Sequence, residues 1–313
     1  MNVKLFLQVA LGALLLAPGV GRAQFRVVGY VPGWRGELNP AQLRYLTHIN
    51  YAFVQPTPTG GLEPVANPDR LRQVVAAAHA AQVRVLVSVG GWHDGDHSAF
   101  DAIGADASRI NTFCASLLGL ANEYGLDGID IDWEHPDATT AAGYAALMRQ
   151  LGAQLHGQGK LLTAAVAGGT WAGAGVRPSV FADVDFLNIM AYDDKPPAHA
   201  TYASAAQALA YWEGLGLPAR KAVLGLPFYG RSASSEEPYA SLLARGADPG
   251  ADLFDGVGYN GLTTIRLKTN LALDQASGVM IWELTQDAAG ASSLLAAISQ
   301  VVRQRTRAAP PAR

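Results

Sequence analysis

Eight short, almost continuously apolar segments recur along the chain and alternate with segments of helical periodicity. Strands that are apolar on both faces are typical of a parallel sheet covered by helices, and eight of them can close into a (β/α)8 barrel. The expected strands span residues 26–31, 48–54, 83–89, 126–134, 161–167, 185–192, 221–229 and 277–283. The expected helices span residues 39–45, 68–81, 108–124, 139–157, 202–215, 261–273 and 287–302. The sequence therefore predicts an α/β fold, a single TIM barrel.

The stretch between the seventh and eighth strands limits what else the fold can contain. Residues 232–276 must supply turns and one helix, which leaves too little chain for an additional α+β domain. We therefore expect a barrel domain over residues 24–303 without such an insertion, an open substrate cleft and a disordered tail over residues 304–313.

The first 23 residues have the pattern of a secretory signal. Lys4 supplies the positive start and residues 5–17 form the apolar run. Gly21-Arg22-Ala23 then resembles a signal-peptidase cleavage site, which is rich in small residues. The run is short for a membrane span, and no cysteine follows it to carry a lipid. We expect cleavage near Ala23 and secretion, extracellular or periplasmic, with a retained anchor as the alternative.

Composition narrows the partners of the mature chain. Removing residues 1–23 deletes two basic residues and no acids, so the formal charge of −3 becomes −5, which disfavours a nucleic-acid partner. Cys114 is the single cysteine, so no internal disulfide can form. It shares a helical stripe with Ile110 and Leu117, which indicates core packing rather than redox chemistry. We expect a monomer that does not bind membranes.

The fourth strand carries acids on one face. Alternation places Asp130, Asp132 and Glu134 together, about 6–7 Å apart in succession. Like charges this close repel, so at least one carboxyl group is expected to keep its proton near neutral pH, as a general acid must. The alternatives are a solvated acidic face or a cation site. The other face is apolar, which disfavours both; it carries Ile129, Ile131 and Trp133.

Aromatic rings and carboxylates gather where seven of the strands end. In a (β/α)8 barrel the active site lies at the carboxyl ends of the strands. Flat rings pack well against the apolar faces of sugars, and acids can act on the linkage between them. The pattern therefore indicates a carbohydrate site. Its aromatic members include Tyr30, Phe53, Trp92, Tyr192, Tyr229 and Trp282.

Four motifs in this order resemble glycoside hydrolase family eighteen, the chitinases and their relatives. Residues 127–134 match the DxxDxDxE signature, and residues 88–91 match the SxGG strand. Residues 190–193 match the sixth-strand motif, and Trp282 matches the tryptophan of the eighth strand. The resemblance covers residues 27–286, nearly the whole mature chain.

The resemblance implies a substrate-assisted mechanism, in which no enzyme carboxylate is the nucleophile. Glu134 would protonate the glycosidic oxygen and later activate water. The acetamido oxygen of the substrate would attack the anomeric carbon and give an oxazolinium intermediate with net retention. Asp132 would orient the acetamido group, and Asp130 would support Asp132 with Ser88 as a hydrogen-bond partner. Tyr192 would donate to the acetamido carbonyl group.

The resemblance also implies a substrate-binding set and a substrate. Trp282 would form the floor under the sugar at the cleavage site, and Asp193 would bind a nearby sugar. The full substrate-binding set is Trp282, Tyr30, Phe53, Gly91, Trp92, Met190, Asp193 and Ser88. The expected activity is endo-acting hydrolysis of β-1,4-linked N-acetylglucosamine chains, without a metal or other cofactor.

The residues themselves favour substrate assistance on one further point. Many barrel glycosidases carry a nucleophilic carboxylate on the seventh strand, and residues 221–229 contain no acid. Glu283 follows Trp282 on the eighth strand. If Trp282 points into the barrel mouth, alternation turns Glu283 away from it.

Several alternatives stay open. A lectin-like barrel would bind chitin without cleaving it, although such relatives typically lose the residue that corresponds to Glu134. An endo-β-N-acetylglucosaminidase acting on N-glycans shares the fold, and peptidoglycan is a weaker option. The residues 93–97, with two histidines, are expected to form a solvated loop rather than a zinc site. Arg231 and Tyr229 have an undecided role. His135, at a position where many relatives carry tyrosine, either tunes the cleft or caps a turn.

Overall fold

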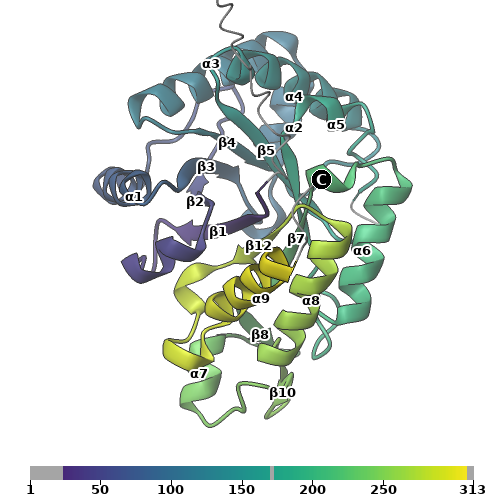
Figure 1. Cartoon of the computed structure of the whole chain (residues 1–313). Helices are drawn as coiled ribbons and strands as arrows, with labels where there is room; N and C mark the ends of the chain where they lie inside the picture. Colours follow the sequence, from purple (N-terminus) through teal and green to yellow (C-terminus); the bar gives the residue numbers. More distant parts are fainter. Residues whose placement is uncertain (1–23, 170–172, 309–313) are drawn as a thin grey trace, which may run out of the picture.

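The computed structural model describes residues 24–169 and 173–308 (Figure 1). The expected signal segment, residues 1–23, lies outside the described residues. Within the described ranges, no helix combines the length and the apolar character needed to cross a bilayer.

Eight parallel strands close into a barrel, which confirms the predicted fold class (Figure 1). Their order around the barrel is β1-β12-β7-β6-β5-β4-β3-β2, so each neighbour in space is also the next barrel strand in sequence. The strands are β1 (Arg26–Pro32), β2 (His48–Val54), β3 (Arg84–Gly90), β4 (Gly128–Asp132), β5 (Leu161–Ala167), β6 (Phe186–Met190), β7 (Ala222–Pro227) and β12 (Gly278–Trp282).

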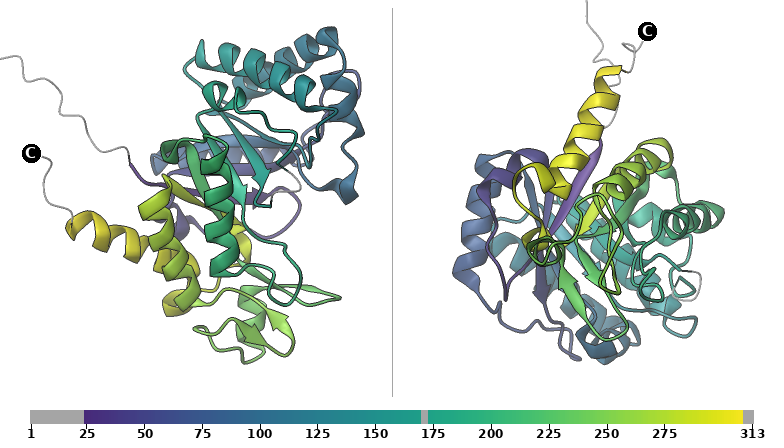
Figure 2. Two further views of the ribbon diagram at one scale, coloured as in Figure 1. Left: turned by 90° about the vertical axis from the view of Figure 1, so that its right-hand side faces the viewer. Right: turned by 90° about the horizontal axis from the view of Figure 1, so that it is seen from below.

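Helices surround the barrel in the views of Figures 1 and 2. Those that follow strands in the (β/α)8 pattern are α1 (Pro68–Ala80), α2 (Ser98–Gly104), α3 (Ala107–Glu123), α4 (Ala141–His156), α5 (Val180–Asp183), α6 (Tyr202–Gly214), α8 (Leu262–Gln275) and α9 (Leu294–Ala308). The predicted helix over residues 39–45 is instead a 3-10 helix, η1 (Pro40–Tyr45). Its N-cap is Asn39, whose side chain accepts from the amide of Ala41. The sequence pattern missed α2 and α5.

Two separate apolar layers hold the barrel. Alternate strand residues such as Ile129 and Ile131 point outward and pack under the helices, where Cys114 is also buried. A smaller inner cluster fills the barrel itself and includes Val28, Tyr30, Phe186 and Met280. Polar residues also face the interior of the barrel, and this inner polar layer is where the candidate site begins.

The fourth strand is shorter than predicted. β4 ends at Asp132, because its pairing with β3 ends at Gly90 opposite Asp132 and its pairing with β5 ends at Ile131 opposite Ala164. Gly90 has a φ of +106° and turns the neighbouring strand away. Trp133 is still buried on the outer side, stacked on Phe100 at 5.0 Å. Glu134 therefore lies beyond the strand rather than on it.

A small unit follows the seventh strand. β8 (Tyr229–Arg231), β9 (Glu236–Pro238), β10 (Leu253–Phe254) and β11 (Val257–Gly258) form a four-stranded antiparallel sheet, with the short helix α7 (Tyr239–Ala244) between β9 and β10. This unit projects below the barrel in Figure 1. The unit is too small to be a large α+β domain, as predicted. Residues 229–258 are nevertheless more ordered than the turns expected there, because they form a sheet and a helix.

The closing helix starts and ends later than predicted. Residues 284–286 and 290–292 form the 3-10 helices η4 (Leu284–Gln286) and η5 (Gly290–Ser292), and α9 begins at Leu294. The Asp287 carboxylate accepts from the amide of Leu294 and so caps the helix from outside it. At the other end α9 continues to Ala308, so part of the predicted disordered tail is helical. Arg305, which pairs with Asp274 on α8, supports this extension.

Candidate active site

Asp130 is the centre of the polar layer inside the barrel. It is fully buried and accepts hydrogen bonds from side chains of four other strands, β1, β3, β5 and β6. The donors are Tyr30 Oη at 2.6 Å, Ser88 Oγ at 2.8 Å, Asn188 Nδ2 at 3.1 Å and Thr163 Oγ1. Burial raises the pKa of Asp130, whereas these hydrogen bonds oppose the rise by stabilising the carboxylate. Asp130 is thus a fixed anchor rather than a free reactant.

Asp132 lies one strand repeat nearer the barrel mouth and is bonded very differently. It is 3% exposed, and its Oδ1 has no hydrogen-bond partner among the described residues. Burial, together with the charges of Glu134 and Asp130, raises the pKa of Asp132 well above its usual range. The group is therefore a buried acid with an unused oxygen, which a ligand with an N–H group could satisfy.

Glu134 has the pKa that an acid–base group needs. Burial, followed by the negative charge of Asp193, raises its pKa to about 7. The sequence predicts that the carboxyl groups of Asp130, Asp132 and Glu134 repel one another along the fourth strand. The structure confirms a raised pKa but shows that burial dominates and that, for Glu134, the repelling charge comes from the end of β6.

Asp193 is held in place by groups from other elements. Its Oδ1 accepts from Tyr229 Oη at 2.7 Å and pairs with Arg231 Nη1 at 3.0 Å. Burial alone would raise its pKa, but the partners, which include His199, lower it. Arg231 and Tyr229, left undecided by the sequence, are therefore partners of a carboxylate at the barrel mouth.

The loop after β6 that carries Asp193 is anchored to α8 by the buried side chain of Lys268. Lys268 Nζ donates to the carbonyl oxygen of Ala200 at 2.8 Å and to Asn260 Oδ1 at 2.7 Å. Burial lowers the pKa of Lys268 to about 7. Sequence reasoning missed this residue, although a lysine within the buried face of a predicted helix was a possible signal.

Tyr192 lies beside Asp132 and Glu134. Burial raises the pKa of its hydroxyl group well above the usual range, and the charges of Asp193, Asp132 and Glu134 raise it further. Its hydroxyl group contacts the sulfur of Met280, at 3.7 Å. Gly225 on β7 makes room for its ring, because a methyl group there would lie 2.9 Å from Tyr192 Cε1. Met190 packs against the same inner cluster.

Three aromatic rings form a continuous stack at the barrel mouth. Trp282 and Phe53 are stacked with centroids 5.5 Å apart, and Phe53 and Trp34 are stacked at 5.8 Å. Tyr30 meets Trp282 edge-on at 5.5 Å. Trp34 is 57% exposed, so the stack runs from the buried acids out to solvent. Gly91 lies against Phe53, where a methyl group would come within 2.5 Å of the ring.

Trp92 and His135 form a second edge of the site. The Trp92 ring is 58% exposed, and its centroid lies 6.5 Å from that of His135. His135 Nε2 lies 3.4 Å from Glu134 Oε2. Exposed rings on both sides of a buried acid pair suit an extended ligand that crosses the barrel mouth.

Glu283 does not join the acids. It is buried on the far side of Trp282, where it accepts from the amide and hydroxyl groups of Thr285 and contacts Arg35 at 3.4 Å. This placement confirms that it turns away from the mouth. β7 carries no acid, so neither strand supplies a second carboxylate to the site.

Sequence reasoning missed Thr163 and Asn188, which both bind Asp130. Each is a single polar residue in an otherwise apolar strand, and that contrast was an available signal. The first acid of the signature, Asp127, lies at the opposite end of β4, where it accepts from the amide of Val85 and contacts His79. Its role is structural.

The histidine loop after β3 forms a 3-10 helix, η2 (His93–Gly95), in which Asp94 has a φ of +54°. His97 contacts Asp101 at 3.0 Å. Among the residues that the structure describes, no group of three or more His, Cys, Asp or Glu side chains is arranged to hold a metal ion.

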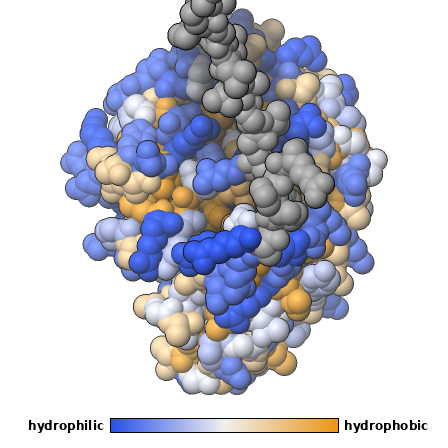
Figure 3. All heavy atoms as spheres, in the orientation of Figure 1, coloured by the Kyte–Doolittle hydropathy of each residue, from blue (hydrophilic) through white to orange (hydrophobic). Residues whose placement is uncertain are grey.

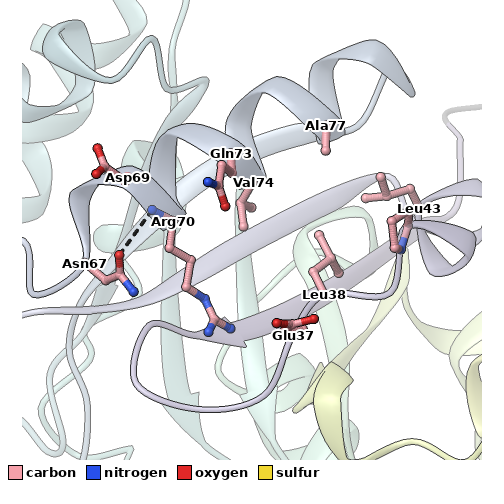
Figure 4. Close-up of a pocket in the computed structure, with 10 residues that line it drawn as sticks. Glu37, Leu38, Leu43, Asn67, Asp69, Arg70, Gln73, Val74 and Ala77 are labelled. Atoms are coloured by element: carbon pink, nitrogen blue, oxygen red, sulfur yellow. Dashed lines mark hydrogen bonds between the residues drawn. The ribbon is translucent and has the colours of Figure 1, made fainter.

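A groove of about 460 Å³ lies outside the barrel, between η1 and α1. Its apolar floor, which includes Leu38, Leu43 and Val74, appears as an orange area in Figure 3 and in close-up in Figure 4. Glu37 and Arg70 stand at its rim (Figure 4). None of the predicted site residues lines this groove, so it is separate from the acid cluster.

A closed parallel barrel with buried acids and stacked rings at the strand ends is typical of barrel glycoside hydrolases. The chain belongs to the glycosyl hydrolases family 18, whose model matches residues 26–287.

Among known relatives, the chain is 28% identical to chitinase B of Serratia marcescens over 290 residues, which cover 70% of this chain and 58% of that protein. It is 34% identical to a probable endochitinase of Caenorhabditis elegans over 179 residues, which cover 48% of this chain and 29% of that protein. The chain thus spans 58% of the length of the first relative and 29% of the length of the second.

The crystal structure of the chitinase ChiB from the chitin utilization locus of Flavobacterium johnsoniae superposes with a TM-score of 0.81 and 26% identity, covering 90% of this chain and 95% of that one. A chitinase-like agglutinin of Robinia pseudoacacia has the same fold, with a TM-score of 0.78 and 24% identity, covering 88% of this chain and 99% of that one.

Proposed function

We propose that this protein hydrolyses β-1,4-linked N-acetylglucosamine chains, with retention at the anomeric carbon, by substrate-assisted catalysis. The observation that carries the proposal is the pairing of Glu134, an acid with a pKa of about 7, with Asp132, a buried acid with an unpartnered oxygen. The two groups suit the two tasks of this mechanism, which are proton transfer and orientation of an acetamido group.

The catalytic cycle assigns one task to each group. Glu134 gives its proton to the glycosidic oxygen as the bond to the anomeric carbon breaks. Asp132 receives the acetamido N–H on Oδ1 and directs the acetamido oxygen to the anomeric carbon. Tyr192, whose hydroxyl group contacts the sulfur of Met280 in this structure, donates to the same acetamido group. Glu134, now ionised, takes a proton from the water that opens the oxazolinium ring.

The placement of Glu283 supports the absence of an enzyme nucleophile. A retaining enzyme of the two-carboxylate type needs a second carboxyl group about 5–5.5 Å from the acid. Glu283 is buried against Thr285 and Arg35, and β7 carries no acid. The acetamido oxygen of the substrate fills this role in the proposed mechanism.

The ring stack supports an extended substrate. Trp282 offers its face to the sugar at the cleavage site, with Trp34 farther out on one side and Trp92 on the edge beside His135. The β8–β11 unit is small, which supports an open site and endo cleavage. Secretion, proposed from residues 1–23, would bring the enzyme to polymeric chitin.

One experiment separates this proposal from its rivals. Purified protein is given chitotetraose in one assay and a high-mannose glycopeptide in another, and the anomeric form of fresh products is read by NMR. We expect β-anomeric chito-oligosaccharides from the first substrate and no reaction of the second. Cleavage of the glycopeptide alone would identify an N-glycan endoglycosidase, and binding of chitotetraose without cleavage would identify a lectin.

Glu134→Gln is the matched variant for this experiment. It keeps the size of the side chain and removes the ionisable proton, so we expect a loss of at least 1,000-fold in turnover with chitotetraose binding retained, on the order expected for an essential acid. Equal activity would exclude Glu134 as the acid.

A further inference from the structure

His135 occupies a special place next to the proposed acid. Its Nε2 lies 3.4 Å from Glu134 Oε2, and both side chains are only 14% exposed. Within the described part of the chain, His135 is the one basic side chain in contact with the Glu134 carboxyl group. None of the roles assigned above to the acid pair, the tyrosine or the ring stack includes it.

The backbone that carries His135 is held from two directions. Gly175, in the loop after β5, packs so closely on Pro136 that a methyl group there would lie 2.2 Å from the Pro136 carbonyl oxygen. On the other side, Asp137 accepts from the amides of Thr139 and Thr140 and locks the turn into α4. The imidazole is therefore presented to Glu134 by a fixed turn.

The charges around the pair leave Glu134 with little stabilisation as an anion. Asp132 on β4 and Asp193 after β6 face it as acids, and the Tyr192 hydroxyl group lies nearby. His97, after η2, faces His135. Burial, followed by the charge of His97, lowers the pKa of His135 to about 4. His135 is therefore neutral at neutral pH and can offer a single N–H group.

We propose that His135 is a positioning residue for the acid–base group: its Nε2–H donates to Glu134 Oε2 once that carboxyl group is ionised. This inference rests on the proposed function. In the cycle, Glu134 becomes an anion when its proton has passed to the leaving sugar. A hydrogen bond to a carboxylate is usually about 2.8 Å long, so the 3.4 Å gap would close at this step. His135 would then hold the anion until water returns a proton.

The direct test is an NMR titration that needs no substrate. The pKa of Glu134 is read from carbon-13 labelled glutamate, with its signal assigned by Glu134→Gln, in the wild type and in His135→Phe. Phenylalanine keeps a ring of similar size and removes the N–H group. Because a lost donor destabilises the anion, we expect the pKa of Glu134 to rise by about one unit in His135→Phe. An unchanged or lowered pKa would overturn the proposal.

Two further variants make the result specific. His135→Gln restores an N–H donor and should return the pKa of Glu134 close to the wild-type value. His156→Phe removes a comparable histidine–carboxylate contact, 3.0 Å from Asp185 and remote from the site, and should leave that pKa unchanged. If His135→Phe does not fold, His135→Met serves as the variant without a donor.

Kinetics provide the second readout. In His135→Phe, the basic limb of the pH profile of kcat/KM on chitotetraose should shift to higher pH by about one unit, and kcat should fall about tenfold. His135→Gln should restore both the limb and kcat. A purely structural role would lower the amount of folded protein without moving the limb. An inactive wild type would refute the proposed function, whereas the NMR titration would still decide the role of His135.

Discussion

The hydroxyl group of Tyr229 donates to Oδ1 of Asp193 over 2.7 Å, which joins the end of the seventh strand to the loop after the sixth. Arg231 reaches the same oxygen at 3.0 Å. These contacts keep Asp193 ionised, and its charge in turn helps Glu134 to keep its proton. Two carboxyl groups at one barrel mouth thus have opposite pKa shifts, a common pattern in acid–base sites.

Asp193→Asn should shift the basic limb of kcat/KM on chitotetraose to lower pH. In the wild type, the rate should fall above about pH 7, because Glu134 must be protonated to act as the acid. Removing the charge of Asp193 lowers the pKa of Glu134, so the decline should begin earlier, by up to about one pH unit. Asp194→Asn, the neighbouring exposed acid, is the matched control and should leave the profile in place. An unmoved limb in Asp193→Asn would contradict the electrostatic link.

Glu134→Gln should stabilise the protein at alkaline pH. The raised pKa of Glu134 means that the folded state binds a proton between pH 4.5 and about 7 that the unfolded state has released. Wild-type stability therefore falls as the pH rises through this range, by about 3 kcal/mol in total. Glutamine does not ionise, so the variant should exceed the wild type by up to this amount at pH 8.

The stability difference between Glu134→Gln and the wild type should nearly vanish at pH 4, where Glu134 is protonated in both the folded and the unfolded state. Urea unfolding of the two proteins at pH 4 and pH 8 measures it. A gap that grows toward low pH would show that the sign is wrong.

Thr163→Val should weaken the anchor at Asp130. Valine has the shape of threonine but leaves one lone pair of a fully buried carboxylate without its donor. Losing a hydrogen bond to a charged group costs about 1.5–3 kcal/mol, so chemical denaturation should show a loss of this order. Thr163→Ser keeps the hydroxyl group and should lose clearly less, and equal losses in both variants would point to packing instead.

Gly225→Ala should displace Tyr192. The new methyl group would lie 2.9 Å from the tyrosine ring and 2.5 Å from the carbonyl oxygen of Ile189, so the ring must move away from the acids. We expect at least a tenfold loss of kcat on chitotetraose, together with lower stability. Gly119→Ala on α3 is the control, because a methyl group there meets no atom within 4 Å. It should keep full activity and be slightly more stable, as alanine favours helices.

The pattern of apolar segments predicted the barrel because each strand is buried on both faces. β2 and β5 have the predicted bounds. The predictions for β4, β6 and α9 were less accurate at their ends. Those ends depend on where a neighbouring strand stops, as at Gly90 and Asp132, or on a distant cap, as at Asp287 and Leu294.

The sequence by itself determined the fold class and the shared face of Asp130 and Asp132 on β4, because these follow from local periodicity. Only the tertiary structure decided how each acid behaves. Glu134 owes its raised pKa to burial and to Asp193, which lies 59 positions away in the chain. Asp130 is anchored by Thr163 and Asn188 from two other strands. Burial and charge act through space, and barrel closure is what brings these groups together.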